Sequence, residues 1–412
     1  MTIENIQCVG DVDKSSFLIF DSGEARKTIN INNLNIINGK SNGPFIKIMG
    51  NLCEVHINNS EIQNVKSYGS IIKDISLKSI ISFSNLNFEE NNNINKLECE
   101  NKSLNGGALY FKESNYSNKN NSSDIQFNNN LFENNDAEYF GGAIYSEYGQ
   151  LYLAKTLNNS IIYNKAGVTG GGIYSPFSVK KNLFDIKSIE IENNIANGLT
   201  NNYASRPSYI VLNTKLDNKI TEIKSGDNFP LTLTLYDEFD QIYDDIIKYY
   251  PLFGLNFDLI QKKDLKNDFE EEYNNNYEKS TKIIGNKCYF NKGVCELSDL
   301  RIYGIPNNNY ILDIKVENFE GNDVEMKFDP IIEIKVLTCD EYHIKMHDKN
   351  GILSCEIPIC NNDCPVSSTA VCKPYTQEIE SDKKNKNENN ICECLPGWEG
   401  KYCEEQKIVD FK

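Results

Sequence analysis

The chain has 412 residues, enough for roughly two to four domains, and carries a formal net charge of −17 at pH 7. This acidity argues against nucleic acids and anionic membranes as partners, because both attract basic surfaces. Of the 13 cysteines, ten follow Lys287, and such local density indicates an oxidising compartment.

A phrase repeats through the first half of the chain. Phe132-Glu-Asn-Asn135 followed by Gly141-Gly-Ala-Ile-Tyr145 returns as Ile161-Ile-Tyr-Asn164 with Gly170-Gly-Gly-Ile-Tyr174, and an earlier copy is Phe88-Glu-Glu-Asn91 with Gly106-Gly-Ala-Leu-Tyr110. With weaker forms at Asn38, Asn64 and Asn194, the asparagines are spaced by 26, 27, 44, 29 and 30 residues, and an insertion explains the long step. A period in this range is typical of a stacked repeat.

The residues that lead into each copy alternate between apolar and polar, as Val55 and Ile57 do with Glu54 and His56. This period of two predicts strands with one buried face. In a stack of coils, the recurring asparagines would form hydrogen-bonded ladders, and the glycine pairs would permit sharp turns and close approach. These repeat positions are Asn91, Asn135, Asn164, Gly106, Gly107, Gly141, Gly142, Gly170 and Gly171. We therefore predict an all-β fold in which residues 1–203 form a right-handed parallel β-helix.

The pairing of FxxN with GGA(I/L)Y resembles the repeat of chlamydial polymorphic outer membrane proteins, which also occurs in large β-helical surface proteins of other organisms. The resemblance covers roughly residues 30–200. It implies a β-helix and says little about the ligand, because one fold serves many functions.

Beyond Arg206 the sequence changes to short apolar runs separated by turn residues. The runs are Tyr209–Leu212, Leu231–Leu235, Leu297–Tyr303, Tyr310–Val316 and Ile331–Val336. This spacing predicts an antiparallel β-sandwich over residues 204–337. Gly293-Val-Cys-Glu-Leu followed by Leu300-Arg-Ile-Tyr-Gly resembles the later strands of filamin-type and bacterial-adhesin immunoglobulin-like modules. Cys288 and Cys295 flank a turn-rich loop, and we expect them to pair across a hairpin.

The C-terminal part is rich in cysteine. Cys392-Glu-Cys394-Leu-Pro-Gly-Trp-Glu-Gly-Lys-Tyr-Cys403 resembles the end of an EGF-like domain, which we expect over residues 359–404, after a disulfide-linked connector at 338–358 and before a tail at 405–412. The family pattern implies the pairs Cys360–Cys372, Cys364–Cys392 and Cys394–Cys403. Cys339 and Cys355 remain, and we expect them to pair with each other. Glu356-Ile-Pro-Ile precedes the module in place of the residues that calcium-binding members carry, so no calcium is expected.

Other residues of the repeat region bear on modification and binding. Six N-glycosylation sequons lie there, at Asn58, Asn101, Asn115, Asn120, Asn121 and Asn158. The sequence names no partner for Cys8, Cys53 or Cys99, and Cys53 is expected on the inward face as a small buried thiol. Tyr110, Tyr145 and Tyr174 recur in register and are expected either to pack in the core and turns or to line a binding face.

Parallel β-helices also include polysaccharide lyases and hydrolases, whose sites cluster carboxylates with basic residues. The aspartates of the repeat region are Asp74, Asp124, Asp136 and Asp185, and they are scattered. Arg26 and His56 are the only arginine and histidine of residues 1–203. No nucleophile elbow, P-loop or zinc-ligand spacing occurs. We therefore expect no enzyme, no cofactor and no metal.

Two further groups of polar residues are interpreted as solvent-exposed and not as metal sites. The segment Asp268–Glu272 and the residues Asp237, Glu238 and Asp240 lack EF-hand spacing, so we expect solvated loops. His343 and His347 are expected on the surface.

These features together predict an extracellular, cell-surface adhesion or recognition ectodomain that binds a glycan or a protein through the β-helix. The alternatives are the ectodomain of a transmembrane receptor and a β-helical polysaccharide lyase or hydrolase. The start at Met1 carries no signal peptide, and no apolar run approaches the ~18 residues of a membrane span. We therefore expect the native polypeptide to extend beyond both ends, and membrane contact through a segment outside this chain.

Overall fold

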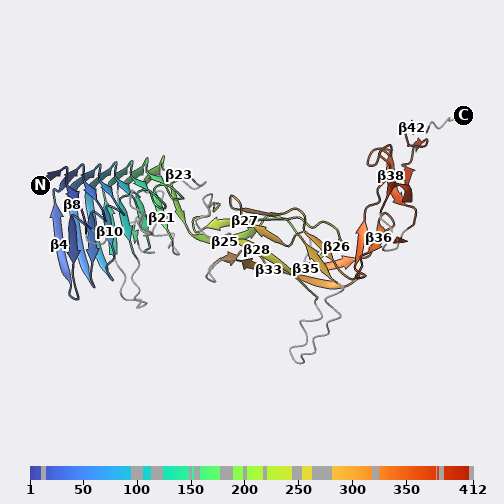
Figure 1. Ribbon diagram of the computed structural model, residues 1–412, viewed down its shortest axis with the longest axis horizontal. Coiled ribbons are helices and arrows are strands. Elements are labelled where there is room, and N and C mark those ends of the chain that lie inside the picture. Colours follow the sequence, from blue (N-terminus) through green and yellow to red (C-terminus); the bar gives the residue numbers. More distant parts are fainter. Residues whose placement is uncertain are drawn as a thin grey trace, which may run out of the picture.

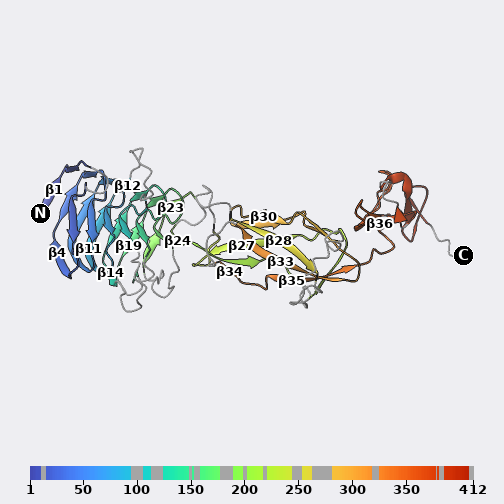
Figure 2. The same cartoon turned by 60° about the horizontal axis from the view of Figure 1, so that its bottom comes forward.

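The computed structural model is all-β and elongated, with three parts in chain order (Figure 1). A parallel β-solenoid lies at the N-terminal end, a two-sheet sandwich in the middle and a disulfide-rich region at the C-terminal end, and Figure 2 shows the same order after rotation. The structure describes residues 1–10, 15–93, 105–112, 124–147, 151–152, 158–176, 189–197, 202–216, 220–243, 253–261, 281–317, 324–376, 378–379 and 385–407. The predicted all-β class and the parallel β-helix are confirmed.

The solenoid strands stack in parallel into three sheets, which we call sheets one, two and three. Sheet one contains β1 (Thr2–Glu4), β4 (Lys27–Asn32), β5 (Asn35–Ile37), β8 (Cys53–Gln63), β11 (Ser79–Glu89), β14 (Asp124–Asn128), β15 (Leu131–Glu133), β18 (Leu151–Tyr152), β19 (Ser160–Ile162) and β22 (Glu190–Glu192). Sheet two contains β2 (Gln7–Cys8), β6 (Lys40–Ser41), β9 (Lys66–Ser67), β12 (Asn92–Asn93), β16 (Asp136–Ala137), β20 (Lys165–Ala166) and β23 (Ile195–Ala196). Sheet three contains β3 (Leu18–Asp21), β7 (Ile46–Met49), β10 (Ile72–Asp74), β13 (Leu109–Phe111), β17 (Ile144–Ser146), β21 (Ile173–Ser175) and β24 (Tyr203–Ser205).

The alternating apolar residues form the solenoid core by stacking in register from one coil to the next. Ile62, Phe88, Phe132 and Ile161 are aligned in neighbouring strands and are all buried. The rings of Phe88 and Phe132 stack with centroids 5.1 Å apart. Because each fully buried side chain of this size contributes about 1.5–3 kcal/mol, the repetition supplies the main stabilisation of the solenoid.

A buried asparagine ladder runs along the solenoid axis as predicted from Asn91, Asn135 and Asn164. Nδ2 of Asn91 donates to Oδ1 of Asn135 over 3.0 Å, and Nδ2 of Asn135 donates to Oδ1 of Asn164 over 2.9 Å. The ladder continues through Asn194, to which Asn164 donates over 2.9 Å.

The assignment of Asn38 and Asn64 to this ladder is wrong by one residue. The register pairs Gln63 with Glu89, so the ladder position of this coil is Val65, whose backbone N–H donates to Oδ1 of Asn91 over 3.0 Å. Asn38 and Asn64 instead lie at the bend before that position with positive φ, and Asn64 donates to Asn38 over 2.7 Å. The misalignment arose because two neighbouring positions of the coil both favour asparagine.

Each glycine of a pair has a different task, and Gly141 and Gly142 show both. Gly141 has φ of 66°, a conformation that most L-residues adopt only with strain. A Cβ built on Gly142 would lie 2.1 Å from the carbonyl oxygen of Gly171 in the next coil. The first glycine therefore makes the turn, and the second allows the coils to approach.

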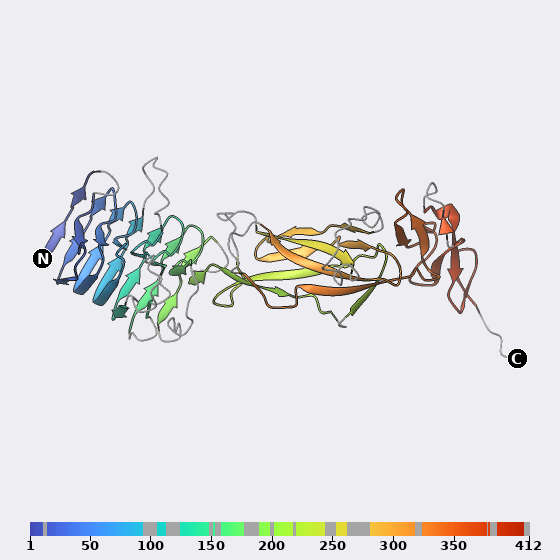
Figure 3. The same ribbon diagram turned by 90° about the horizontal axis from the view of Figure 1, so that it is seen from below.

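The sandwich follows the solenoid directly, and its two sheets share one apolar core. One sheet contains β31 (Val294–Leu297), β27 (Leu231–Asp237), β25 (Pro207–Leu212) and β34 (Glu325–Met326). The other contains β26 (Ile220–Lys224), β35 (Ile331–Leu337), β33 (Asn309–Glu317), β28 (Gly254–Gln261) and β30 (Lys287–Tyr289), and a ribbon pairs β29 (Lys282–Ile284) with β32 (Arg301–Tyr303). Figure 3 shows these strands running along the long axis, whereas the solenoid strands cross it.

The sandwich differs from the sequence-based prediction in strand direction, in the bounds of one strand and in the place of one disulfide. The edge pairs β25–β34 and β26–β35 are parallel. The apolar run 297–303 is not one strand, since β31 ends at Leu297 and β32 begins at Arg301. The disulfide Cys288–Cys295 joins β30 of one sheet to β31 of the other, so it links the two sheets and does not cross a hairpin ladder.

The disulfide-rich region consists of short ladders. They are β37 (Leu353–Glu356) with β36 (Ile344–His347) and β39 (Glu378–Ile379), β38 (Ala370–Pro374) with β40 (Asn390–Cys394), and β41 (Trp398–Glu399) with β42 (Glu405–Gln406), and a 3₁₀ turn η5 (Asn387–Asn389) precedes β40. The last solenoid strand ends at Ser205, two residues beyond the predicted boundary at 203, and β35 ends at Leu337, where the predicted sandwich ends.

Candidate functional site

The outward side chains of β4, of the first halves of β8 and β11, and of β14 form an extended surface on sheet one, which we call the polar face. Its residues are Thr28, Asn30, Asn32, Glu54, His56, Asn58, Ile80, Ser82, Ser84, Gln126 and Asn128. Parallel pairing places equivalent residues of neighbouring strands about 4.8 Å apart, so amides and hydroxyls repeat along the axis. Among these residues Glu54 is the one carboxylate, but Asp124 pairs with Ile80 in the same row of the sheet, and Glu61 and Glu89 lie on the outward side of β8 and β11 beyond the bend.

Glu54 is compensated by its neighbours. It accepts hydrogen bonds from Nε and Nη2 of Arg26 over 3.0 and 2.6 Å and from the Thr28 hydroxyl over 2.9 Å, and Nε2 of His56 lies 3.2 Å away. These contacts, Arg26 first, lower the pKa of the Glu54 carboxyl to about 2. Arg26 and His56 stand out in the sequence as single residues of their type, but their meeting at Glu54 is visible only in the structure. Thr28 and Glu54 are 26 residues apart, one coil of the repeat, and that spacing was the available signal.

A line of exposed amides borders the polar face where β8 and β11 bend. Nδ2 of Asn85 donates to Asn59 over 2.8 Å, Asn129 donates to Asn85 over 3.1 Å, and Asn158 donates to Asn129 over 3.1 Å. All four have positive φ, which asparagine tolerates better than most residues. This second ladder was not predicted from the sequence, because Asn59 and Asn85 lie within the long strands β8 and β11 and outside the repeated phrase.

The recurring tyrosines pack against the solenoid more than they line a binding face. The Tyr110 and Tyr145 rings stack with centroids 4.9 Å apart, and those of Tyr145 and Tyr174 with centroids 5.9 Å apart. Tyr145 is 8% exposed and Tyr174 is fully buried, in a small cluster outside sheet three that includes Phe140 and Val168. Tyr110 remains partly exposed, and burial together with the nearby Glu147 raises the pKa of its hydroxyl. Of the two expectations for these residues, packing describes Tyr145 and Tyr174.

The aspartates of the repeat region do not converge. Asp74 lies in β10 on the inward side of sheet three and is fully buried, and its oxygens accept hydrogen bonds from the hydroxyls of Ser76 and Ser79. Burial raises the pKa of the Asp74 carboxyl to about 6. Asp136 lies in β16 of sheet two, where burial raises the pKa of its carboxyl. Asp124 lies in β14, and Asp185 and the side chain of Asp124 lie outside the described residues.

Two of the six sequon asparagines fall in described segments. Asn58 is partly exposed on the polar face, and its Nδ2 donates to Oδ1 of Asn32 over 3.1 Å. Asn158 is exposed at the end of the amide line. The Nδ2 of an asparagine carries two hydrogens, and N-glycosylation replaces one of them. The other hydrogen can still donate to the neighbouring asparagine. Asn101, Asn115, Asn120 and Asn121 lie outside the described residues.

The acidic turn after β27 is not the solvated loop that the sequence suggested. Asp237 is fully buried and accepts hydrogen bonds from backbone N–H groups, while Asp240 accepts one from the Tyr209 hydroxyl over 2.7 Å. Burial raises the pKa of the Asp237 carboxyl to about 6. The segment Asp268–Glu272 lies outside the described residues, and Glu238 faces Arg206 at 3.8 Å.

The cysteines of the C-terminal half are joined in five pairs, the same five that the sequence analysis named. They are Cys288–Cys295, Cys339–Cys355, Cys360–Cys372, Cys364–Cys392 and Cys394–Cys403. In the described part of the solenoid, Cys8 and Cys53 are free thiols, and burial raises the pKa of both. Cys53 is fully buried on the inward face, as expected, and Cys99 lies outside the described residues.

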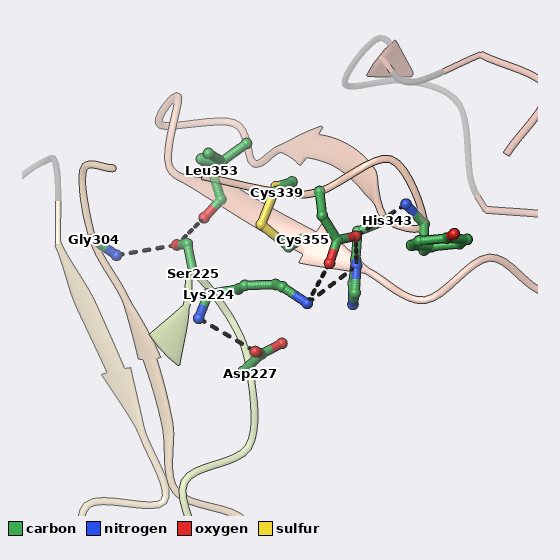
Figure 4. The surroundings of a disulfide bond; sticks show 10 residues. Lys224, Ser225, Asp227, Gly304, Cys339, His343, Leu353 and Cys355 are labelled. Carbon is green, nitrogen blue, oxygen red and sulfur yellow. Dashed lines mark hydrogen bonds and ion pairs between the residues drawn. A yellow bond between two sulfur atoms is a disulfide. The ribbon is translucent and has the colours of Figure 1, made fainter. Parts of the chain in front are cut away.

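The Cys339–Cys355 disulfide lies where the disulfide-rich region meets the sandwich (Figure 4). The backbone N–H of Cys355 donates to the Ser225 carbonyl over 2.7 Å, and the Ser225 hydroxyl donates to the Leu353 carbonyl over 2.5 Å. The hydroxyl oxygen also accepts a hydrogen bond from the backbone N–H of Gly304 over 3.1 Å. Ser225 thus connects two sandwich strands to the hairpin that the disulfide closes.

An ion pair lies beside this contact. Nζ of Lys224 is 2.7 Å from Asp340, and Nδ1 of His343 is 2.5 Å from the same carboxylate (Figure 4). Against partial desolvation, the hydrogen bonds from Lys224 and His343 hold the pKa of the Asp340 carboxyl well below its usual range. His343 therefore belongs to this junction and is largely covered, whereas His347 is exposed as expected.

No protein-family model matches the chain, and a search of curated proteins finds no significant relative. Within the described ranges, no group of three or more histidine, cysteine, aspartate or glutamate side chains is arranged to hold a metal ion. The same ranges contain no helix long and apolar enough to cross a membrane.

Proposed function

We propose that this protein is an extracellular recognition ectodomain that binds an extended, neutral glycan through the polar face. The observation that carries the proposal is the composition of that face. It presents regularly spaced amides and hydroxyls, and Arg26 compensates the charge of Glu54. Amide and hydroxyl groups both donate and accept hydrogen bonds, as sugar hydroxyls require. A repeating ligand suits a surface that repeats at each coil.

A protein ligand is the less favoured partner. Protein interfaces concentrate their binding energy in buried aromatic and arginine side chains. The named residues of the polar face include no aromatic ring besides the His56 imidazole, and its largest apolar side chain is Ile80. The recurring tyrosines, which would suit a protein partner, are mostly buried elsewhere.

The disulfides support an extracellular location, because five bridges in one chain are typical of oxidising compartments. Within this proposal the sandwich is an immunoglobulin-like module, and the C-terminal cysteines form an EGF-like module. We also propose that sequons other than Asn58, which lies in the polar face, carry glycans and that the protein is displayed at the cell surface.

We further propose that binding is not followed by catalysis. The support is the separation of the acidic groups: Asp74 is buried in sheet three and hydrogen-bonded to two serines, and Asp136 lies on sheet two. A glycosidase needs two carboxyl groups across one bond.

The test is to introduce bulk and charge into the polar face. Purified protein is applied to an array of neutral and acidic glycans and to immobilised matrix proteins. Ser82→Arg and Ser84→Arg should abolish glycan binding, because each places a long cation in the middle of the face. Asn92→Arg, a half-buried position on sheet two, is the matched control and should bind normally. Unaltered glycan binding by both serine variants, or binding to matrix proteins alone, would refute the proposal.

A further inference from the structure

The C-terminal end of the solenoid is an edge that needs hydrogen-bond partners. β24 is the last strand of sheet three, pairing with β21 on one side. Edge strands present unpaired backbone groups, and a solenoid needs a cap over its terminal coil. At this edge lies a turn of the sandwich, Asp237–Gln241, which follows β27.

The side chains and backbone of this turn bond to the edge of β24. Nε2 of Gln241 donates to the Tyr203 carbonyl over 2.9 Å. The backbone N–H of Ser205 donates to Oδ2 of Asp237 over 3.1 Å, and the backbone N–H of Glu238 donates to the Ser205 hydroxyl over 2.8 Å. Both a carbonyl and an N–H group of the terminal strand are therefore satisfied by the sandwich.

The same turn covers the end of the apolar core. Phe239 packs against the core cluster of the solenoid although it belongs to the sandwich by sequence. Its ring meets that of Tyr203 edge to face, with centroids 5.1 Å apart and an interplanar angle of 74°. This geometry is favourable for aromatic pairs, and it shields apolar surface that the last coil would otherwise expose.

Asp237 fixes the shape of the turn. Its Oδ1 accepts the backbone N–H groups of Phe239 over 2.9 Å and of Gln241 over 3.0 Å, while Oδ2 accepts from Ser205. One buried carboxylate thus sets the positions of the ring and of the amide and also bonds the edge strand.

We propose that the turn Asp237–Gln241, which belongs to the neighbouring sandwich of the same chain, is the C-terminal cap of the solenoid. The two units are then one cooperative structure, in which the terminal coil is ordered only while the sandwich is folded against it. The cap also occupies the edge at which another strand would add, so it prevents self-association at this end.

Peptide-resolved hydrogen exchange on the full chain tests the cap. Phe239→Ala should make the amides of β21 and β24 exchange about tenfold faster while β8 and β11 keep their rates, because only the terminal coil is uncovered. Phe253→Ala is the matched control, since Phe253 packs on Phe290 in the sandwich core, with centroids 5.2 Å apart, away from the turn. It should accelerate exchange in β28 and accelerate β24 clearly less than Phe239→Ala does, because the turn remains in place as long as the sandwich is folded.

A milder variant keeps the proposal testable if Phe239→Ala does not fold. Gln241→Met preserves the side-chain length and removes the donor to Tyr203, so β24 should exchange about threefold faster. Faster exchange at β24 in this variant, with β11 unchanged, supports the cap. Wild-type exchange at β24 in Gln241→Met refutes it, and so does equal acceleration of β24 by Phe239→Ala and Phe253→Ala.

Discussion

The solenoid and the disulfide-rich region are stabilised by opposite means. Within its described part, the solenoid buries 27 apolar residues in one cluster and leaves Cys8 and Cys53 as free thiols. Among the described residues of the disulfide-rich region, the buried cluster has three members, Cys364, Ala370 and Cys403, and both cysteines are bridged. A unit too small to bury a core depends on covalent links, whereas a repeating unit obtains its core by stacking. The difference predicts that each region fails for its own reason.

The buried ladder offers the largest effect. Asn135→Ala removes the acceptor of Asn91 Nδ2 and the donor to the Phe88 carbonyl, at 3.0 Å each, and leaves both groups buried. The free energy of unfolding should fall by about 4 kcal/mol, measured by chemical denaturation. Asn129→Gly, which keeps the positive φ of the exposed amide line, should cost less than about 1 kcal/mol. Equal costs would mean that burial does not distinguish the two ladders.

The close approach of coils gives the next effect. Gly142→Val forces a side chain against the Gly171 carbonyl, and we expect a loss of about 3 kcal/mol in the free energy of unfolding. Gly23→Ala is the control: Gly23 also lies in the solenoid, with φ of 60° and no atom near its Cβ position. It should lose about 1 kcal/mol from backbone strain alone. An unchanged melting midpoint in Gly142→Val would contradict the packing described here.

The buried carboxyl of Asp74 makes the solenoid less stable as the pH rises. A carboxylate in a surface ion pair has the opposite effect. Its pKa rises from 3.8 to about 6 on folding, so the folded state holds the proton more tightly. Stability from this group is therefore full below about pH 4, declines up to about pH 6 and is flat above, a change of ~3 kcal/mol. Asp74→Asn removes the titration. The difference in unfolding free energy between variant and wild type should shift in favour of the variant as the pH rises from 4 to 6.5, and a constant difference would contradict this.

The smallest effect concerns a single bridge. Replacing Cys394 and Cys403 with serine opens a link that spans nine residues, and we expect a loss of about 2 kcal/mol confined to the disulfide-rich region. Melting of the solenoid, followed by far-ultraviolet circular dichroism, should be unchanged. A lowered solenoid transition would show that the two regions are coupled.

The parts of the fold that could be predicted from the sequence are those specified by residues close together in the chain. The coil period, the ladder Asn91–Asn135–Asn164 and the strands β25, β27, β33 and β35 follow from periodicity. The strands β26 and β30 were missed, because Ile220–Lys224 and Lys287–Tyr289 are short and mix charged and apolar residues. The strand β28 was missed although Leu255, Phe257 and Leu259 alternate with polar residues. Their places depend on partners far along the chain.

The candidate site was less accessible to sequence reasoning for the same reason. The meeting of Arg26 with Glu54 depends on the register of β4 against β8, which follows from the repeat only if the coil is aligned correctly. The alignment at Asn38 and Asn64 was one residue out, and a shift of one residue moves side chains to the opposite face. The burial of Asp237 depends on contact between two units, which no local pattern encodes.

Limited proteolysis with and without reductant tests the contrast between the two regions most directly. The full chain is digested with trypsin in native buffer, and the products are mapped by mass spectrometry before and after reduction under the same conditions. We expect reduction to make the lysines of residues 339–407 cleavable while those of β4, β6 and β9 stay protected, because stacking and ladders hold the solenoid. Cleavage throughout the solenoid on reduction, or a disulfide-rich region that resists trypsin when its bridges are open, would contradict the account.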